Sequence, residues 1–249
     1  MSGHSKWATT KYRKGAQDAA RSKLFAKHIR SLEVAARDGG GDVNVNASLR
    51  TAYEKARSDS VPMDTIERAI KRGTGEGGGA RYEAVTYEGY APNGVAVIVE
   101  TLTDNRNRTA AELRNLFTRN GGSLAEPGAV SWQFARKGVL DLDLALDEDR
   151  IMEAALDAGA EDLTDVGERW QLVCAPQDLA AVRSALEEAG IPPQSAELTM
   201  VPTTSVEVAD SGEAQKVLRL LEAIDDHDDV QTIHANYDIA EDVMAAYAG

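Results

Sequence analysis

Cysteine, aromatic residues and long apolar runs are all scarce in this sequence. Cys174 is the one cysteine among 249 residues, which excludes an internal disulfide and fits a reducing compartment. Aromatic side chains make up 5% of the chain, so the cores must consist mainly of aliphatic residues. No apolar run approaches the roughly 18 residues that a membrane-spanning helix needs. The basic N-terminus lacks the apolar stretch of a secretory signal, and we therefore expect a cytoplasmic protein.

Patterns typical of catalysis and metal binding are also missing. The histidines are His4, His28, His227 and His234. None has metal-ligand spacing to Cys, Asp or Glu. Residues 73–79 are rich in glycine but lack the Lys-Ser/Thr pair of a phosphate-binding loop. Cys174 falls in an expected strand, where a buried, inert thiol is the better interpretation. The sequence therefore predicts a non-enzymatic protein with no metal and no cofactor.

An acidic run precedes the last expected strand. It contains Asp225, Asp226, Asp228 and Asp229. Such a cluster could attract a cation, but the ligand spacing of a calcium-binding EF-hand is missing. We expect these aspartates to form a solvated turn.

Charge divides the chain into two unequal parts. The net charge is −14, yet residues 1–75 carry 15 basic and 8 acidic residues, a net of +7. Residues 76–249 carry 12 basic and 33 acidic residues, a net of −21. A phosphate backbone would attract the first part and repel the second. The distribution can therefore orient the basic end toward nucleic acid.

Positive charge is most concentrated in residues 4–30. This segment holds eight Lys or Arg and one acid, Asp18. Its aromatics Trp7 and Tyr12 could stack on bases. One alternative is a solvated N-terminal arm that serves solubility alone. The confinement of the basic excess to one end favours nucleic-acid binding. The candidate contacts are Lys6, Trp7, Lys11, Arg13, Lys14, Arg21, Lys23, Lys27 and Arg30.

The motif TDNRNRT (103–109) provides a second candidate site. It joins an expected buried strand to an expected helix, so Arg106 and Arg108 would project beside backbone N–H groups. This combination suits a phosphate or another anion. Alternatively, Asp104 and Asn105 only shape the turn and the arginines are solvated. In either case we expect both arginines to be exposed, and their replacement by alanine should hardly change the melting temperature.

Apolar spacing predicts three helices before the glycine-rich segment. The first starts near Asp18 and ends at a run of three glycines. Asn46 is the expected N-cap of the second. The third is expected to start at a capping box formed by Asp64 and Glu67. Residues 73–79 then form a flexible linker.

Beyond the linker the pattern changes to strands. We expect strands at 82–90, 95–102 and 130–134. A helix over about 110–119 should start at a second capping box, formed by Thr109 and Glu112.

The remaining residues contain a repeated arrangement of elements. Residues 136–203 follow the β-α-β-β-α-β order of ferredoxin-like folds. Residues 204–240 supply a strand at 205–208, a helix and a final strand. Joined to the strand-helix-strand of 94–134, they restore the same order, with 82–90 as an added strand. The sequence thus predicts a multidomain α+β protein with a small helical N-terminal domain followed by two α+β (ferredoxin-like) domains, one inserted into the other. The expected domains are 1–75, 80–135 plus 204–240, and the inserted 136–203.

Several motifs resemble those of the YebC/PmpR family. They are GHSKW (3–7), KYRK (11–14), QDAARSKLFAKHIR (17–30), GGGD (39–42), PMDTIERAIKRGTG (62–75), YEGYAPNGVAVIVETLTDNRNRT (87–109) and NGGSL (120–124). The resemblance is dense in residues 3–134 and weaker in the acidic remainder. It implies a three-domain fold and a cytoplasmic, non-enzymatic protein.

The resemblance leaves two functions open. Members of the family are generally described as DNA-binding transcriptional regulators, which is our first expectation. The family also includes translation factors, such as the mitochondrial activator of cytochrome oxidase translation. Bacterial relatives are linked to relief of stalling at proline runs. A ribosome-associated factor that binds ribosomal RNA is therefore the alternative, because the same cations serve both targets. The sequence indicates no oligomeric state.

Overall fold

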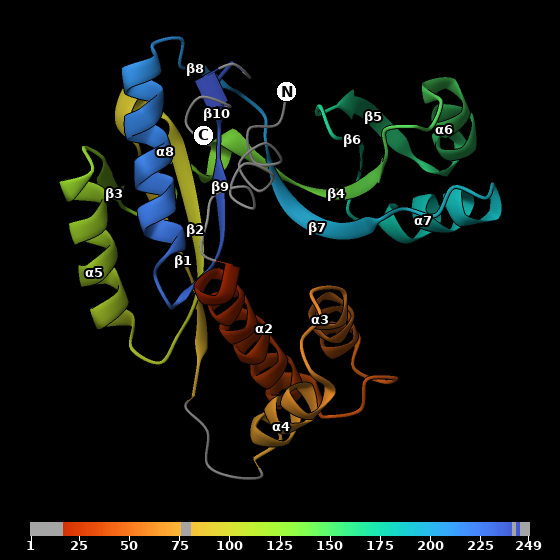
Figure 1. The fold of residues 1–249 in the computed structure, drawn as a ribbon, viewed down its shortest axis with the longest axis horizontal. Coiled ribbons are helices and arrows are strands. Elements are labelled where there is room, and N and C mark those ends of the chain that lie inside the picture. Colours follow the sequence, from red (N-terminus) through yellow and green to blue (C-terminus); the bar gives the residue numbers. More distant parts are fainter. Residues whose placement is uncertain (1–16, 76–80, 241–242, 245–249) are drawn as a thin grey trace.

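A long helix opens the described part of the chain. The computed structural model describes residues 17–75, 81–240 and 243–244 (Figure 1). Helix α2 spans Gln17–Gly39, which confirms the predicted helix and its end at the glycine run. Leu32 and Ala36 lie one turn apart on its buried face.

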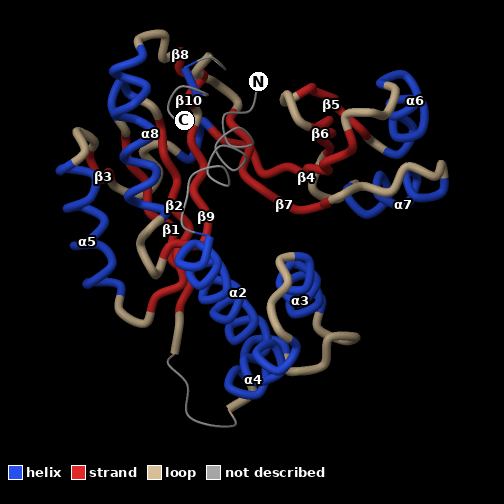
Figure 2. Tube along the Cα trace, viewed as in Figure 1, coloured by secondary structure: helices blue, strands red, loops and turns tan. Residues whose placement is uncertain are grey.

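Two shorter helices pack against α2 (Figure 2). Helix α3 spans Ala47–Ser58 and is capped as predicted, because the Asn46 Oδ1 atom accepts a hydrogen bond from the Leu49 N–H at 3.0 Å. Helix α4 spans Met63–Gly73 and approaches α2 closely. A Cβ atom on Gly73 would lie 2.5 Å from a backbone oxygen of α2, so the contact requires glycine.

The predicted capping box of the third helix is wrong. Helix α4 follows Pro62, and no side chain caps its first turn. Asp64 therefore lies inside the helix, where its carboxylate pairs with Arg68 at 2.8 Å.

The first sheet has four antiparallel strands in the order β3-β1-β2-β9. The strands are β1 (Glu83–Tyr90), β2 (Ala96–Thr103), β3 (Ser123–Ala125) and β9 (Val230–Ala235). Helices α5 (Arg106–Arg119) and α8 (Ser211–Asp225) cover one face (Figure 1). Val97 and Val99 of β2 pack there against Phe117 and Leu221. Residues before position 100 and residues after position 205 therefore share one hydrophobic core.

Two predicted strands lie elsewhere than expected. Residues 131–133 form a 3-10 turn, η2 (Ser131–Gln133), and the next strand begins at Phe134. Backbone N–H groups of this stretch donate to the carboxylate of Glu88, so they are not available for strand pairing. Strand β8 (Val206–Glu207) pairs with β10 (Tyr237–Asp238) in a separate two-stranded sheet. Strand β1, not the segment expected at 205–208, lies beside β2 in the first sheet.

The second sheet lies in the inserted segment and has the order β5-β6-β4-β7. Its elements run in the predicted β-α-β-β-α-β sequence. They are β4 (Phe134–Asp143), α6 (Glu148–Ala155), the short turn η3 (Leu156–Ala158), β5 (Ala160–Asp165), β6 (Arg169–Cys174), α7 (Leu179–Glu188) and β7 (Ser195–Pro202). A core of its own contains Leu140, Ile151 and Leu172. Cys174 belongs to this core and is buried, as predicted. The α+β fold class with a helical N-terminal region is therefore confirmed.

None of the helices in the described part of the chain combines the length and apolarity needed to cross a bilayer.

Candidate nucleic-acid interface

The turn between α8 and β9 contacts both candidate sites. We call residues 225–229 the aspartate turn. The prediction of a solvated turn holds for Asp226 and Asp228, which are exposed. It is wrong for Asp225 and Asp229, whose side chains are only 12% and 3% exposed. Helix α2 lies against the turn and covers them.

Three cations of α2 form ion pairs with the aspartate turn. They occupy positions i, i+4 and i+7, so they share one face of the helix. The pairs are Lys23 with Asp226 at 2.7 Å, Lys27 with Asp225 at 2.8 Å and Arg30 with Asp229 at 3.2 Å. The Arg30 guanidinium also donates to the backbone carbonyl of Asp228 and lies over the Tyr82 ring, 5.4 Å from its centre. These predicted phosphate contacts therefore face carboxylates in this structure.

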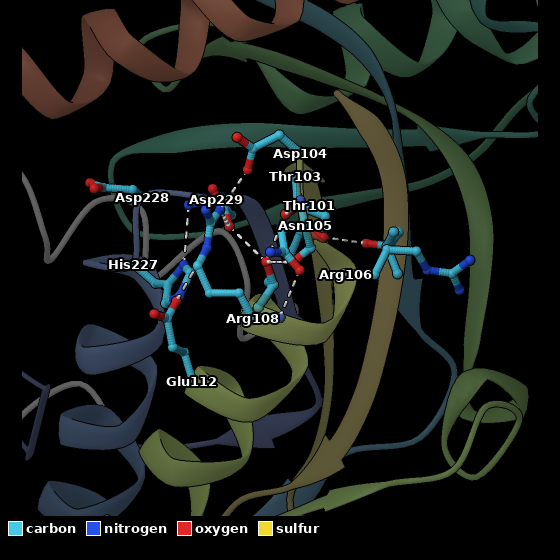
Figure 3. Close-up of polar contacts among 12 residues, drawn as sticks. Thr101, Thr103, Asp104, Asn105, Arg106, Arg108, Glu112, His227, Asp228 and Asp229 are labelled. Atoms are coloured by element: carbon cyan, nitrogen blue, oxygen red, sulfur yellow. Dashed lines mark hydrogen bonds and ion pairs between the residues drawn. The ribbon is translucent and has the colours of Figure 1, made fainter. Parts of the chain in front are cut away.

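Asp229 joins three elements through its buried carboxylate (Figure 3). One oxygen accepts from the Arg30 guanidinium of α2. The other accepts from the Thr109 hydroxyl at 2.7 Å and from the Arg108 guanidinium at 2.8 Å, both on α5. Burial alone would raise the pKa of Asp229, but these hydrogen bonds and the two guanidinium charges outweigh it and lower the pKa below its ordinary value. Asp229 is therefore ionised at neutral pH.

The TDNRNRT loop begins α5 through an asparagine cap. The Asn105 Oδ1 atom accepts from the Arg108 N–H at 3.1 Å, so the helix starts at Arg106. The capping box predicted at Thr109 and Glu112 is wrong, since both residues lie within the helix. Thr109 is buried beneath the loop, and Glu112 binds the His227 ring at 2.8 Å.

The two arginines of the loop differ sharply in environment. Figure 3 shows Arg106 extending away from the cluster, and its nearest carboxylate is that of Glu83 at 3.9 Å. The Arg108 guanidinium instead binds Asp104 and Asp229, each at 2.8 Å. Hydrogen bonding to Asp229 and its charge raise the pKa of Arg108 further above its ordinary value. Arg106 is the loop cation that remains accessible to an anion. The Arg108 guanidinium is instead held between two carboxylates of the protein.

A polar cleft of about 530 Å³ lies between α2, α5 and the aspartate turn. Its walls combine Arg30 and Arg108 with Asp104, Glu112 and Asp228. Opposite charges are thus interleaved, and the cleft does not present one sign of charge. Among the described residues, no group of three or more His, Cys, Asp or Glu is arranged to hold a metal ion.

The remaining predicted contacts lie near the first described residues or outside the described part of the chain. Arg21 is exposed, with its guanidinium 5.5 Å from the centre of the Phe25 ring. The five N-terminal candidates lie outside the described residues. They are Lys6, Trp7, Lys11, Arg13 and Lys14.

Sequence reasoning missed the central role of Asp229. Within the run DDHDDV the four aspartates look equivalent. One signal was present, because Asp229 directly precedes an apolar strand and so must lie at the edge of the core. Its partners Arg108 and Thr109 are about 120 positions away, which sequence periodicity does not reveal.

Comparison with known proteins identifies relatives over nearly the whole chain. The family description "TACO1/YebC protein N-terminal domain" matches residues 5–76, and "TACO1/YebC second and third domain" matches residues 82–237. A protein of Beutenbergia cavernae is 56% identical, with 98% of each chain covered. A protein of Thermobifida fusca is 55% identical, with 98% of this chain and 99% of its own covered. Both bear the name probable transcriptional regulatory protein.

A solved structure has the same fold. The crystal structure of a conserved hypothetical protein from Aquifex aeolicus superposes with a TM-score of 0.81 at 45% identity. The match covers 90% of this chain and 93% of that one. The fold is therefore shared with that protein. Because the two family descriptions match residues 5–76 and 82–237, and relatives are about 55% identical over 98% of the chain, this chain belongs to the TACO1/YebC family.

Proposed function

We propose that this protein is a non-enzymatic, cytoplasmic regulator of gene expression that binds nucleic acid through its N-terminal segment. A DNA-binding regulator of transcription is the form that we favour. The names of the relatives support a regulatory role. The observation that carries the proposal is the separation of charge, +7 in residues 1–75 against −21 in the rest.

The basic segment is suited to phosphates rather than to a compact ligand. Its eight cations are spread over 27 residues, a span that matches an extended polyanion. Arg21 is exposed on α2 and Arg106 is exposed on α5. Phosphate contacts of this kind position a protein on nucleic acid without reading its sequence. Base recognition would then come from groups such as Trp7.

Removal of four cations tests the proposal. In the variant K6Q/K11Q/R13Q/K14Q, we expect the affinity for a labelled DNA duplex to fall at least about tenfold at moderate salt, with a slope of log K against log salt shallower by about 3 to 4. Fluorescence anisotropy over a salt series measures both quantities. Unchanged affinity and slope would contradict the proposal.

A matched control removes the same charge from the acidic body. The variant R114Q/R119Q/R136Q/R219Q changes four exposed arginines. If long-range charge alone governed binding, both variants would lose affinity equally. If the N-terminal segment contacts the nucleic acid directly, the control variant should keep most of its affinity.

A comparison of RNA binding with DNA binding distinguishes the two candidate functions. A hairpin RNA and a DNA duplex of matched length should be compared under identical salt. In cells, altered promoter occupancy in a deletion strain with unchanged ribosome pausing supports transcription. New pauses at proline codons in ribosome profiles support the ribosome-associated alternative instead.

A further inference from the structure

The cations that should bind phosphates are already occupied by carboxylates of the same chain. Lys23, Lys27 and Arg30 all pair with the aspartate turn, about 200 positions away. Their nucleic-acid role rests on the function proposed above. In this structure the aspartate turn therefore stands where a phosphate backbone would have to lie.

The ion pairs and hydrogen bonds that α2 makes with residues 225–231 form a polar contact. Besides the three ion pairs, the Ser31 hydroxyl lies 3.2 Å from the Gln231 Oε1 atom. The apolar side of α2 faces α3 and α4, where Leu32 and Ala36 join the core of the helical segment. That core shares no residue with the core beneath α5 and α8. Separation of α2 from the turn thus breaks ion pairs without opening either core.

The ion pairs are graded in strength along the helix. Lys23 and Asp226 are 47% and 61% exposed, a setting in which a pair contributes little. Lys27 and Asp225 are 14% and 12% exposed and are screened less by salt. Such a contact holds the helix in place yet can be exchanged for other anions.

We propose that the aspartate turn mimics phosphate and competes with nucleic acid for the cations of α2. In the closed state α2 is paired with the turn, and in the open state it is released. Binding then exchanges carboxylates for phosphates on the same three side chains. Because part of the population is closed, the apparent affinity is lower than that of the open form. The acidic turn is thus a regulatory element of the binding segment.

Neutralising two carboxylates of the aspartate turn tests this competition. In the full-length variant D225N/D226N, we expect affinity for both the DNA duplex and the hairpin RNA to rise about three- to tenfold. The slope of log K against log salt should become steeper by about 1 to 2, because the variant has no freed carboxylates that take up cations and offset those released from the phosphates.

The control changes charge by the same amount at a remote position. Asp157 and Glu188 are exposed in the inserted segment, so D157N/E188Q equals the test variant in net charge. An equal rise in affinity for both variants would overturn the proposal, because it would trace the effect to net charge. Unchanged affinity in D225N/D226N would overturn it as well.

A second readout needs no nucleic acid. Lys27 is nearly covered when paired, so its rate of acylation, followed by peptide mass spectrometry, reports opening of α2. In D226N the partner of Lys27 is retained, and we expect its acylation to become about twofold faster or more while exposed Lys71 is unchanged.

The two readouts separate the proposals. Faster acylation of Lys27 without nucleic-acid binding by any variant would reject the proposed function and leave the closed contact established. Unchanged acylation in D226N together with unchanged affinity in D225N/D226N would show that the aspartate turn does not hold α2. The melting temperature of D226N should match that of the unmodified protein, because Asp226 is exposed.

Discussion

At the residue scale, the buried carboxylate of Asp229 decides how the TDNRNRT loop behaves. It accepts hydrogen bonds from Arg108 and Thr109 of α5 and pairs with Arg30 of α2. A buried carboxylate that loses a charged partner keeps its desolvation penalty without compensation. The two arginines of the loop, which look alike in sequence, should therefore respond differently to substitution.

We predict that Arg108→Ala lowers the free energy of unfolding by about 1 to 2 kcal/mol, because it leaves Asp229 with one charged partner fewer. Arg106→Ala should change it by less than about 0.5 kcal/mol, since that side chain is largely exposed. Urea denaturation of both variants measures the difference. Equal stability of the two would refute the structural role assigned to Arg108, and it would restore the expectation that both arginines are free.

At the element scale, a buried glutamate shapes the connection between the two sheets. The Glu88 carboxylate of β1 accepts hydrogen bonds from the backbone N–H groups of Gly128, Val130 and Ser131. Burial by itself would raise the pKa of Glu88, but these backbone bonds and the Ser131 hydroxyl lower it below the ordinary value of 4.5. The ionised form is therefore the one that holds the connection.

The depressed pKa predicts a pH dependence of stability. A carboxylate whose pKa is lower in the folded state stabilises fully above its unfolded pKa, and this stabilisation is lost as the pH falls through the folded value. We expect the free energy of unfolding to decline below about pH 4.5. Glu88→Gln should flatten that decline and cost about 1 to 3 kcal/mol at neutral pH, because one amide oxygen replaces two carboxylate oxygens.

Chemical denaturation across this pH range, with exposed Glu83→Gln as the control, measures the effect. A decline that is identical in Glu88→Gln and in the unmodified protein would assign the acid sensitivity to other carboxylates. Asp229, whose pKa is also depressed, is the next group to test.

Local pattern accounts for most elements but not for their pairing. The cap at Asn46 and the glycine stop after α2 act within one turn of chain, so sequence predicted them. The strand expected at 130–134 failed because its N–H groups donate to Glu88, about 40 positions earlier. Likewise, β1 and not β8 completes the first sheet, since strand pairing is a contact across the chain.

At the scale of the whole molecule, uneven charge predicts salt-sensitive binding. If six to eight cations of the N-terminal segment contact duplex phosphates, log K should fall against log salt with a slope of about −5 to −7. Titrations at several salt concentrations measure this slope. A flat response would exclude phosphate contact as the main source of affinity.

The sequence by itself determined the charge division, the α+β class and most helices, because composition, apolar period and caps act locally. It also placed Arg106 and Arg108 at a helix start. Only the tertiary structure decided which cations pair with carboxylates of the same chain. Lys23, Lys27 and Arg30 meet carboxylates that the chain carries about 200 residues later, and such pairing depends on how α2 lies against the first sheet.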